Sequence, residues 1–275
     1  MSNPKVLSTA SHPGEGGHWY QSNGDQVTSV TGAKGQPVKP DVRHARKLNL
    51  GPGVTTIIKS ASAPGLERWK RNQAVAAALT LERESGEDEK SYLRRIEVLA
   101  EERSIAARDE GTQIHAAIQS KIDGDPVDER WFSHVEVAMV ALRGVGIEDY
   151  KAEVSCAHPL GYGTKADLVG HRSGWLIDFK TKDELGESPT VYDEHLMQLA
   201  ATREALLWAG YQIDRAGICF ISRAETPKAV IVEAKLDDVR GRGWSMFVAL
   251  NSYWKVKNRH SPSWPTTHFD MEDES

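Results

Sequence analysis

The sequence predicts a mixed α/β fold in which helices flank a central β-sheet. Apolar residues recur at helical spacing between about residues 55 and 145. From residue 149 onward they alternate as they do in β-strands, and two further helical segments separate and follow these strands. The order is helices, three strands, helix, two strands and helix, which indicates an α/β core with a mixed sheet and an added helical part before it.

The bulk composition is that of a soluble protein with one large domain. The chain has 275 residues, of which 39% are hydrophobic and 27% charged. No apolar run approaches the ~20 residues that span a bilayer, and the N-terminus has no signal pattern. Two cysteines are too few for a disulfide framework or a four-thiolate metal site. We therefore expect a cytoplasmic, intracellular protein without a membrane partner.

The net charge of −5 excludes a broadly basic protein that coats duplex DNA, but a local cationic groove can still bind a strand.

The chain divides by composition into three parts. Residues 1–50 are expected to be an N-terminal extension that packs on the core, with a β-hairpin at the turn signal Asn23-Gly24. Residues 51–260 would form the main domain, including the helical region 55–145, and residues 261–275 a loose tail.

The remaining element boundaries follow from periodicity and turn residues. Thr55 is a candidate cap for a short helix that starts at Thr56. Longer helices are predicted at 66–81, 91–122, 130–143, 192–210 and 238–257, and strands at 149–158, 215–222 and 228–235.

Two aspartates lie on the two arms of a predicted hairpin within residues 161–182. The polar stretch 171–174 supplies the turn, so Gly170 pairs with Trp175. Counting back along both strands places Asp167 opposite Asp178. Side chains directly opposed in a hairpin lie about 4.5–5.5 Å apart at Cβ, where like charges repel. The pair therefore needs a shared proton or a cation between its members.

Lys180 lies two residues after Asp178 and so points to the same face of the strand. Carboxylates beside an ammonium group suit phosphodiester hydrolysis, because the acids hold Mg²⁺ or Mn²⁺ and the lysine stabilises charge or orients the attacking water. The alternative is a surface hairpin with scattered charges, which the Asp-x-Lys triplet alone does not exclude. Three further polar residues lie on neighbouring elements: Glu153 on the preceding strand, His115 on the long helix and Gln198 on the following helix.

This ordered series resembles the PD-(D/E)XK nuclease superfamily in its RecB-like branch. The branch reads Gly-Thr-x-x-His on a helix, a strand glutamate, Gly-x-x-Asp, Asp-x-Lys and a helix glutamine. The matching residues here are Gly111 to His115, Glu153, the segment ending at Asp167, Asp178 to Lys180, and Gln198. Stretches of the N-terminal half are similar to exonucleases encoded by bacterial viruses and to the mitochondrial single-strand DNA exonuclease.

The resemblance implies a PD-(D/E)XK, restriction-endonuclease-like core and a role for each matched residue. Its metal, Mg²⁺ or Mn²⁺, would be bound by His115, Asp167, Asp178 and the carbonyl of Phe179. Lys180 would position or activate the attacking water. Gln198 would support the site, and Glu153 would be a nearby acid.

The activity implied is that of an exodeoxyribonuclease on single-stranded or free DNA ends, in a virus-encoded protein of a bacterial host. A recombinase or a single-strand-binding protein is an implied partner class. Candidate DNA contacts are Thr55 and Thr56 at a helix start, and Trp69, Lys70 and Arg71 on one helix, where an aromatic ring lies beside cations. Simple capping and a core position are the alternatives for the threonines and the tryptophan.

The added helices have enough mass to wall in a single-strand channel. Two alternatives remain open at this stage: an endonuclease of the same superfamily, and a nucleic-acid-binding protein that keeps the fold without turnover. The chain departs from the branch at Thr202, where a tyrosine is usual, and at Gly53, where a serine is usual. Its two cysteines exclude the iron–sulfur members.

Overall fold

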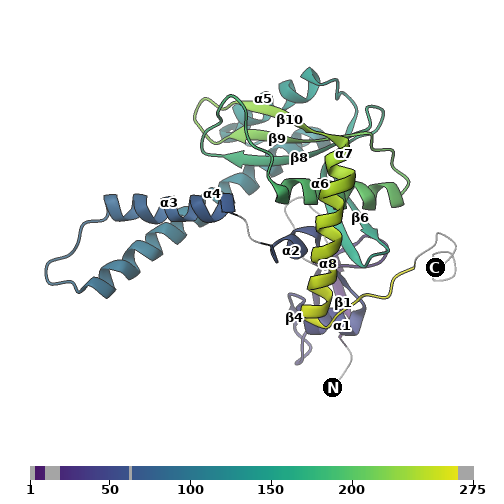
Figure 1. The fold of residues 1–275 in the computed structure, drawn as a ribbon, viewed down its shortest axis with the longest axis horizontal. Helices are drawn as coiled ribbons and strands as arrows, with labels where there is room; N and C mark the ends of the chain where they lie inside the picture. The colour runs from purple at the N-terminus through teal and green to yellow at the C-terminus, as the bar shows by residue number, and fades with distance from the viewer. Residues whose placement is uncertain (1–3, 10–18, 62–63, 266–275) are drawn as a thin grey trace.

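The computed structural model describes residues 4–9, 19–61 and 64–265, and its fold is mixed α/β (Figure 1). The central sheet has the strand order β10-β9-β8-β7-β6. Its strands are β6 (Tyr150–His158), β7 (Tyr162–Gly170), β8 (Trp175–Lys182), β9 (Arg215–Ser222) and β10 (Ala229–Ala234). β8 and β9 pair in parallel and the other neighbours pair antiparallel, so the sheet is mixed as the sequence predicted.

Helices cover both faces of this sheet. The parallel pair β8–β9 is joined by the crossover helix α6 (Asp193–Trp208), as parallel strands require. α6 packs with α8 (Trp244–Asn258) and α2 (Val54–Ile58), while α4 (Glu89–Asp123) packs with α5 (Phe132–Gly144). Alternate residues of β8 enter the two resulting cores: Leu176 lies in the α6 core and Ile177 in the α5 core.

A helical hairpin projects from the body of the molecule (Figure 1). α3 (Pro64–Thr80) runs outward and packs along the first half of α4, and the second half of α4 reaches β6 and β8. α4 continues through Gly111 without a break. The tip of this hairpin therefore lies away from the sheet instead of walling in a channel, and only the base of α3 and the end of α4 lie beside the strands.

The N-terminal part forms a second, small sheet. It contains β1 (Val6–Thr9), β2 (Trp19–Tyr20), β3 (Gln26–Thr31), β4 (Pro37–Val38) and β5 (Gly51–Pro52), with the helix α1 (Val42–Leu48) before β5. β2 and β3 pair antiparallel around Gly24, whose φ of 92° suits the predicted turn. This sheet packs closely on β7, because a Cβ on Gly163 would lie 2.1 Å from the Tyr20 ring.

The segment after α8 is docked, which corrects part of the expected loose tail. The Trp264 side chain is buried, and its Nε1 donates to the Asn49 carbonyl at 2.8 Å. Ser263 N donates to Asn49 Oδ1 at 2.8 Å. Residues 261–265 therefore close over the N-terminal part, and residues 266–275 lie outside the described residues. The last helical segment starts two residues before the predicted 238, and it consists of α7 (Leu236–Asp238), a π-helical turn (Val239–Gly243) and α8.

Among the described helices, none combines the length and apolarity needed to cross a bilayer.

Candidate active site

The central sheet forks where the two predicted aspartates lie. β7 and β8 pair through Gly170↔Trp175, Val169↔Leu176 and Leu168↔Ile177, which is the predicted register. The paired positions end there, although both strands continue: β7 goes on pairing with β6, and β8 with β9. Asp167 and Asp178 are the next residues of this register, so they face each other across the fork.

Asp167 occupies the fork through its side chain. Its Oδ2 accepts a hydrogen bond of 2.8 Å from the backbone N–H of Phe179. A strand N–H at this position would otherwise require a ladder partner or water, because buried backbone donors are almost always paired. The carboxylate therefore stabilises the separated strands and is held beside Asp178.

Glu153 continues the row of acids on β6. The β6–β7 register pairs Ala152 with Leu168 and Val154 with Ala166, so Glu153 lies level with Asp167. Its φ of 52° is in the left-handed region, which a non-glycine residue in a strand rarely adopts. Strain of this kind costs about 1–3 kcal/mol and clusters at functional sites. Three carboxylates thus lie level on three adjacent strands. We call Glu153, Asp167 and Asp178 the acid row.

Both carboxylate oxygens of Asp178 have close neighbours. Lys180 Nζ lies 2.6 Å from Oδ2, and Gln198 Nε2, from α6, donates to Oδ1 at 2.5 Å. Asp178 is only 5% exposed. Gln198 therefore fixes the orientation of the carboxylate, and Lys180 places a positive charge directly on it.

His115 reaches the acid row from α4. Its Nδ1 lies 3.8 Å from Asp167 Oδ2, and its ring packs edge-on against Phe179 with a centroid distance of 5.8 Å. The His115 side chain is 31% exposed. The structure thus brings together the residues that matched the family resemblance: His115, Glu153, Asp167, Asp178, Phe179, Lys180 and Gln198.

Burial dominates the electrostatics of the site. It raises the pKa of Asp167 to about 6, against opposing contributions from Lys180 and the Phe179 N–H. Burial likewise raises the pKa of Asp178 to about 6, and the charge of Asp167 adds to that shift. Burial alone would lower the pKa of Lys180, but Asp178 and Asp167 together raise it. Burial and then Lys180 lower the pKa of His115 to about 4, so its ring is neutral at pH 7 and can act as a ligand.

The residues of the acid row suit a hard divalent cation by their chemistry. Glu153 Oε2 and Asp178 Oδ2 are buried and accept no hydrogen bond of standard geometry, although each is ion-paired, with Lys165 and Lys180 respectively. Carboxylate oxygens are ligands for Mg²⁺ and Mn²⁺, and a neutral imidazole adds a nitrogen ligand that favours the transition metal Mn²⁺ over Mg²⁺. In the described ranges, however, no three His, Cys, Asp or Glu side chains converge closely enough to hold an ion between them. A cation binding here would take over the neutralising role that Lys180 has at Asp178.

The two threonines predicted to contact DNA lie on α2, which packs on α6, α8 and β7. Gly53 occupies the N-cap of this five-residue helix, and no side chain caps it, so the predicted capping by Thr55 is wrong. The helix starts earlier than expected because Val54 packs into the α6 core. Thr55 is exposed and Thr56 partly buried.

Trp69, Lys70 and Arg71 lie near the base of α3, close to the end of β8. Trp69 Nε1 donates to Asp183 Oδ2 at 3.1 Å, and Asp183 directly follows β8. Lys70 and Arg71 are exposed. The indole N–H therefore ties the helical hairpin to the strand that carries Asp178 and Lys180.

Two cations near the site were not predicted. Lys165, which pairs with Glu153, lies two residues before Asp167, and the same period-2 reasoning that joined Asp178 to Lys180 could have found it. Arg223 follows β9 and donates to Thr181 Oγ1 at 3.0 Å, forms an ion pair with Asp183, and lies 3.6 Å from Glu110 of α4. Arg223 joins elements far apart in the sequence, so no local signal could have identified it.

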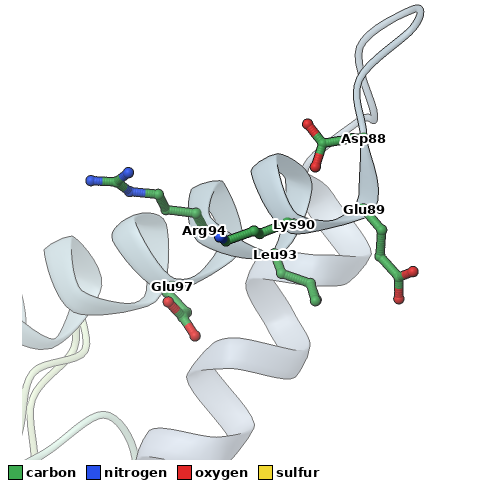
Figure 2. A pocket seen from close by; sticks show the side chains of 6 residues that line it. All are labelled: Asp88, Glu89, Lys90, Leu93, Arg94 and Glu97. Atoms are coloured by element: carbon green, nitrogen blue, oxygen red, sulfur yellow. The ribbon is translucent and has the colours of Figure 1, made fainter.

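A surface hollow lies far from this chemistry, at the start of α4. It is lined by Asp88, Glu89, Lys90, Leu93, Arg94 and Glu97, all from the first turns of that helix and its cap (Figure 2). Because these side chains come from one exposed helix end and carry mixed charge, we assign no function to the hollow.

Comparisons with known proteins leave the family open. No family model matches the sequence, and no curated protein matches it. One solved structure, described as "Crystal structure of SSO0001", is 14% identical, with a TM-score of 0.29, and the match covers 72% of this chain and 89% of that one. A likeness of this size carries no argument about fold family or activity.

Proposed function

We propose that the protein is a metal-dependent deoxyribonuclease with a PD-(D/E)XK core, acting as an exonuclease on single-stranded DNA or free DNA ends. The observation that carries the proposal is the site at the fork: Asp167 and Asp178 face each other, and Lys180 and Gln198 hold the two oxygens of Asp178. The order of these residues along the chain also carries the family resemblance. We propose DNA as the substrate because of that resemblance.

In this proposal each residue of the site has its own role. Asp167, Asp178 and His115 would hold Mg²⁺ or Mn²⁺, which when bound neutralises the phosphate and lowers the pKa of a water. Gln198 keeps the Asp178 carboxylate in one orientation through its 2.5 Å hydrogen bond. The raised pKa of Lys180 keeps its ammonium group protonated, so it stabilises negative charge and orients the nucleophile instead of accepting a proton.

The direct experiment measures release of acid-soluble nucleotides from linear DNA. We expect release with Mg²⁺ or Mn²⁺, none in EDTA, and recovery when either ion is added back. Absence of release under all these conditions, with DNA binding intact, would favour the non-catalytic nucleic-acid-binding alternative. Efficient cutting inside closed single-stranded circles would favour the endonuclease alternative.

A further inference from the structure

Positive charge is concentrated at one end of this protein, although the net charge of the chain is −5. α1 contains three basic residues and no acidic one. Residues 244–265 contain three more and no Asp or Glu. We call these six residues the basic surface: Arg43, Arg46 and Lys47 from α1, and Lys255, Lys257 and Arg259 from the end of α8 and the residue after it.

The two halves of the basic surface are joined. The Arg46 guanidinium donates to the Asn258 carbonyl, one residue before Arg259. His260 Nε2 lies 2.6 Å from the Leu50 carbonyl, and besides burial the charges of both Arg46 and Lys255 lower the pKa of His260. α1 lies beside the far end of α8 (Figure 1). Arg46, Lys255 and Arg259 therefore lie where the two elements meet, and the other three basic residues lie within three positions of them along the same two elements.

These charges are available to a partner. Lys255 is half-buried, and the other five basic side chains are exposed. The neighbouring acid of α1, Asp41, caps that helix and pairs with His44 at 2.7 Å. Among the residues that the structure describes, no salt bridge involves any of the six.

An aromatic ring lies among the cations. Tyr253 is 52% exposed, and Lys257 Nζ lies 5.6 Å from the centre of its ring. Exposed aromatic rings beside basic side chains are typical of surfaces that bind single strands, because the ring stacks on a base while the cations contact phosphates. An acidic protein partner would use the charges but would leave this ring unexplained.

The basic surface is separate from the acid row. α8 packs on the turn between β6 and β7, where Asn251 Nδ2 donates to the Leu160 carbonyl at 3.1 Å and Tyr162 packs against Phe247. Asp167 lies five residues further along β7 than Tyr162, or ~17 Å at strand spacing. Lys255 and the residues beyond it follow Asn251 by at least one helical turn, so they lie past this end of β7.

We propose that the basic surface binds the phosphate backbone of single-stranded DNA and holds the strand outside the site of cleavage. This proposal rests on the proposed nuclease function, which it deepens by adding a second contact region for the substrate. Tyr253 stacks on a base of the held strand.

The test measures binding of a fluorescent linear single-stranded oligonucleotide by anisotropy, in EDTA so that nothing is cut, over a series of salt concentrations. The variant Arg43→Gln/Lys47→Gln/Lys257→Gln removes three exposed charges and leaves Arg46 in place. We expect it to bind roughly tenfold more weakly at low salt, with a salt slope shallower by about 2, since each phosphate contact to a single strand contributes about 0.7. Tyr253→Ala should weaken binding without changing the slope.

The matched control is Lys90→Gln/Arg94→Gln/Lys228→Gln, which removes the same charge from exposed positions elsewhere and should bind like the wild type. Thermal unfolding checks that each variant is folded. Unchanged affinity and slope in the first variant, an equal loss in the control, or binding of anionic lipid vesicles in place of the oligonucleotide would overturn the proposal.

Cleavage of a trinucleotide and of a long strand separates this proposal from the nuclease function. If the wild type cuts neither substrate, the proposed function fails, whatever the binding result. If the wild type cuts both and the variant cuts the long strand equally fast, only the basic surface is misassigned. We expect the variant to lose rate on the long strand alone.

Discussion

At the scale of single residues, Lys180 contacts Asp178 directly. Its Nζ lies 2.6 Å from Asp178 Oδ2, the place where a cation would neutralise the same oxygen. The other oxygen of Asp178, Oδ1, accepts a hydrogen bond from Gln198, which does not involve the lysine. Under the proposed function, we expect the lysine to be needed for turnover but not for holding the ion.

Lys180→Met should bind Mn²⁺ as tightly as the wild type or more tightly, while turnover falls by orders of magnitude. Isothermal titration calorimetry and nucleotide release measure the two effects. Lys182→Met is the control: its Nζ lies 4.8 Å from the Phe220 ring centre, and its removal should leave Mn²⁺ affinity unchanged. Loss of Mn²⁺ binding together with activity in Lys180→Met would contradict this role.

The raised pKa of Asp178 predicts a pH-dependent stability without metal. Its pKa is about 6 in the folded protein and 3.8 ordinarily, so between these pH values the folded protein binds more protons than the unfolded chain. Its contribution to the free energy of unfolding therefore falls as pH rises through this window. Asp178→Asn lacks this pH dependence. The free energy of unfolding of the variant, minus that of the wild type, should therefore increase by on the order of 2 kcal/mol from pH 4 to pH 7.

Urea unfolding in EDTA across that pH range measures the difference. His115 titrates in the opposite sense in both proteins, and because the Asp178 charge raises the pKa of His115, that pKa is lower still in the variant. If the free energies of unfolding of the wild type and Asp178→Asn change in parallel with pH, the pKa of Asp178 is not raised in the folded protein.

The sequence could predict which residues meet, but not how they are held. Strand alternation and turn counting gave the register that opposes Asp167 and Asp178, and the family resemblance added His115 and Gln198. The left-handed backbone of Glu153 and the bond from Phe179 N–H to Asp167 depend on strands bending under tertiary packing. No periodicity in the sequence reports that bending.

At the scale of elements, the fork between β7 and β8 is supported by α4, which packs close to β8. Gly111 of α4 is buried, and a Cβ there would lie 2.6 Å from Thr181 Oγ1. Thr181 cannot move freely, because its Oγ1 accepts a hydrogen bond from Arg223. Gly111 therefore permits close packing of α4 beside Lys180.

Gly111→Ala should therefore destabilise the protein by about 1–3 kcal/mol, the usual cost of overpacking, although alanine is the better helix former. It should also lower activity, since Thr181 is adjacent to Lys180. Gly144→Ala is the control: it ends α5, and a Cβ there meets nothing within 4 Å. Thermal unfolding of both variants checks this; equal or higher stability of Gly111→Ala would mean that the contact is not tight.

Element order and type were largely predictable, because long amphipathic helices and alternating strands carry strong periodic signals. The boundaries near packed junctions were not. α2 begins at Val54 instead of Thr56, and the segment before α8 forms a π-helical turn, where Gly243 lies close to the Leu196 backbone. Both shifts follow from contacts with α6 that local sequence does not encode.

At the scale of the whole molecule, positive charge is local and the added helices project from the body. The chain is acidic overall, and its basic surface is confined to α1 and the end of α8. The projecting hairpin of α3 and α4 meets the body beside β8, where Trp69 bonds Asp183 (Figure 1). The sequence predicted the added helices but not that they project. The periodicity of a helix shows which face is apolar, but not which element that face packs against.

We predict that linear single-stranded DNA is degraded to short products, that duplex DNA is attacked slowly, and that covalently closed single-stranded circles resist. A local cationic surface grips a flexible strand more readily than it grips a stiff duplex, and an exonuclease needs an end. A gel assay that compares the three substrates in Mn²⁺ measures this. Duplex and single strand cut at equal rates would contradict the preference.

The most direct test of the acid row is the cleavage rate of linear single-stranded DNA in Mn²⁺ by Asp178→Asn, compared with Glu233→Gln. Glu233 is an exposed strand carboxylate in the same sheet, paired with Arg215 at 2.7 Å. We predict that Asp178→Asn loses activity by roughly 1,000-fold, about 4 kcal/mol of barrier, while staying folded, and that Glu233→Gln cuts like the wild type. A folded Asp178→Asn protein that cuts at the wild-type rate would contradict the assignment of the active site.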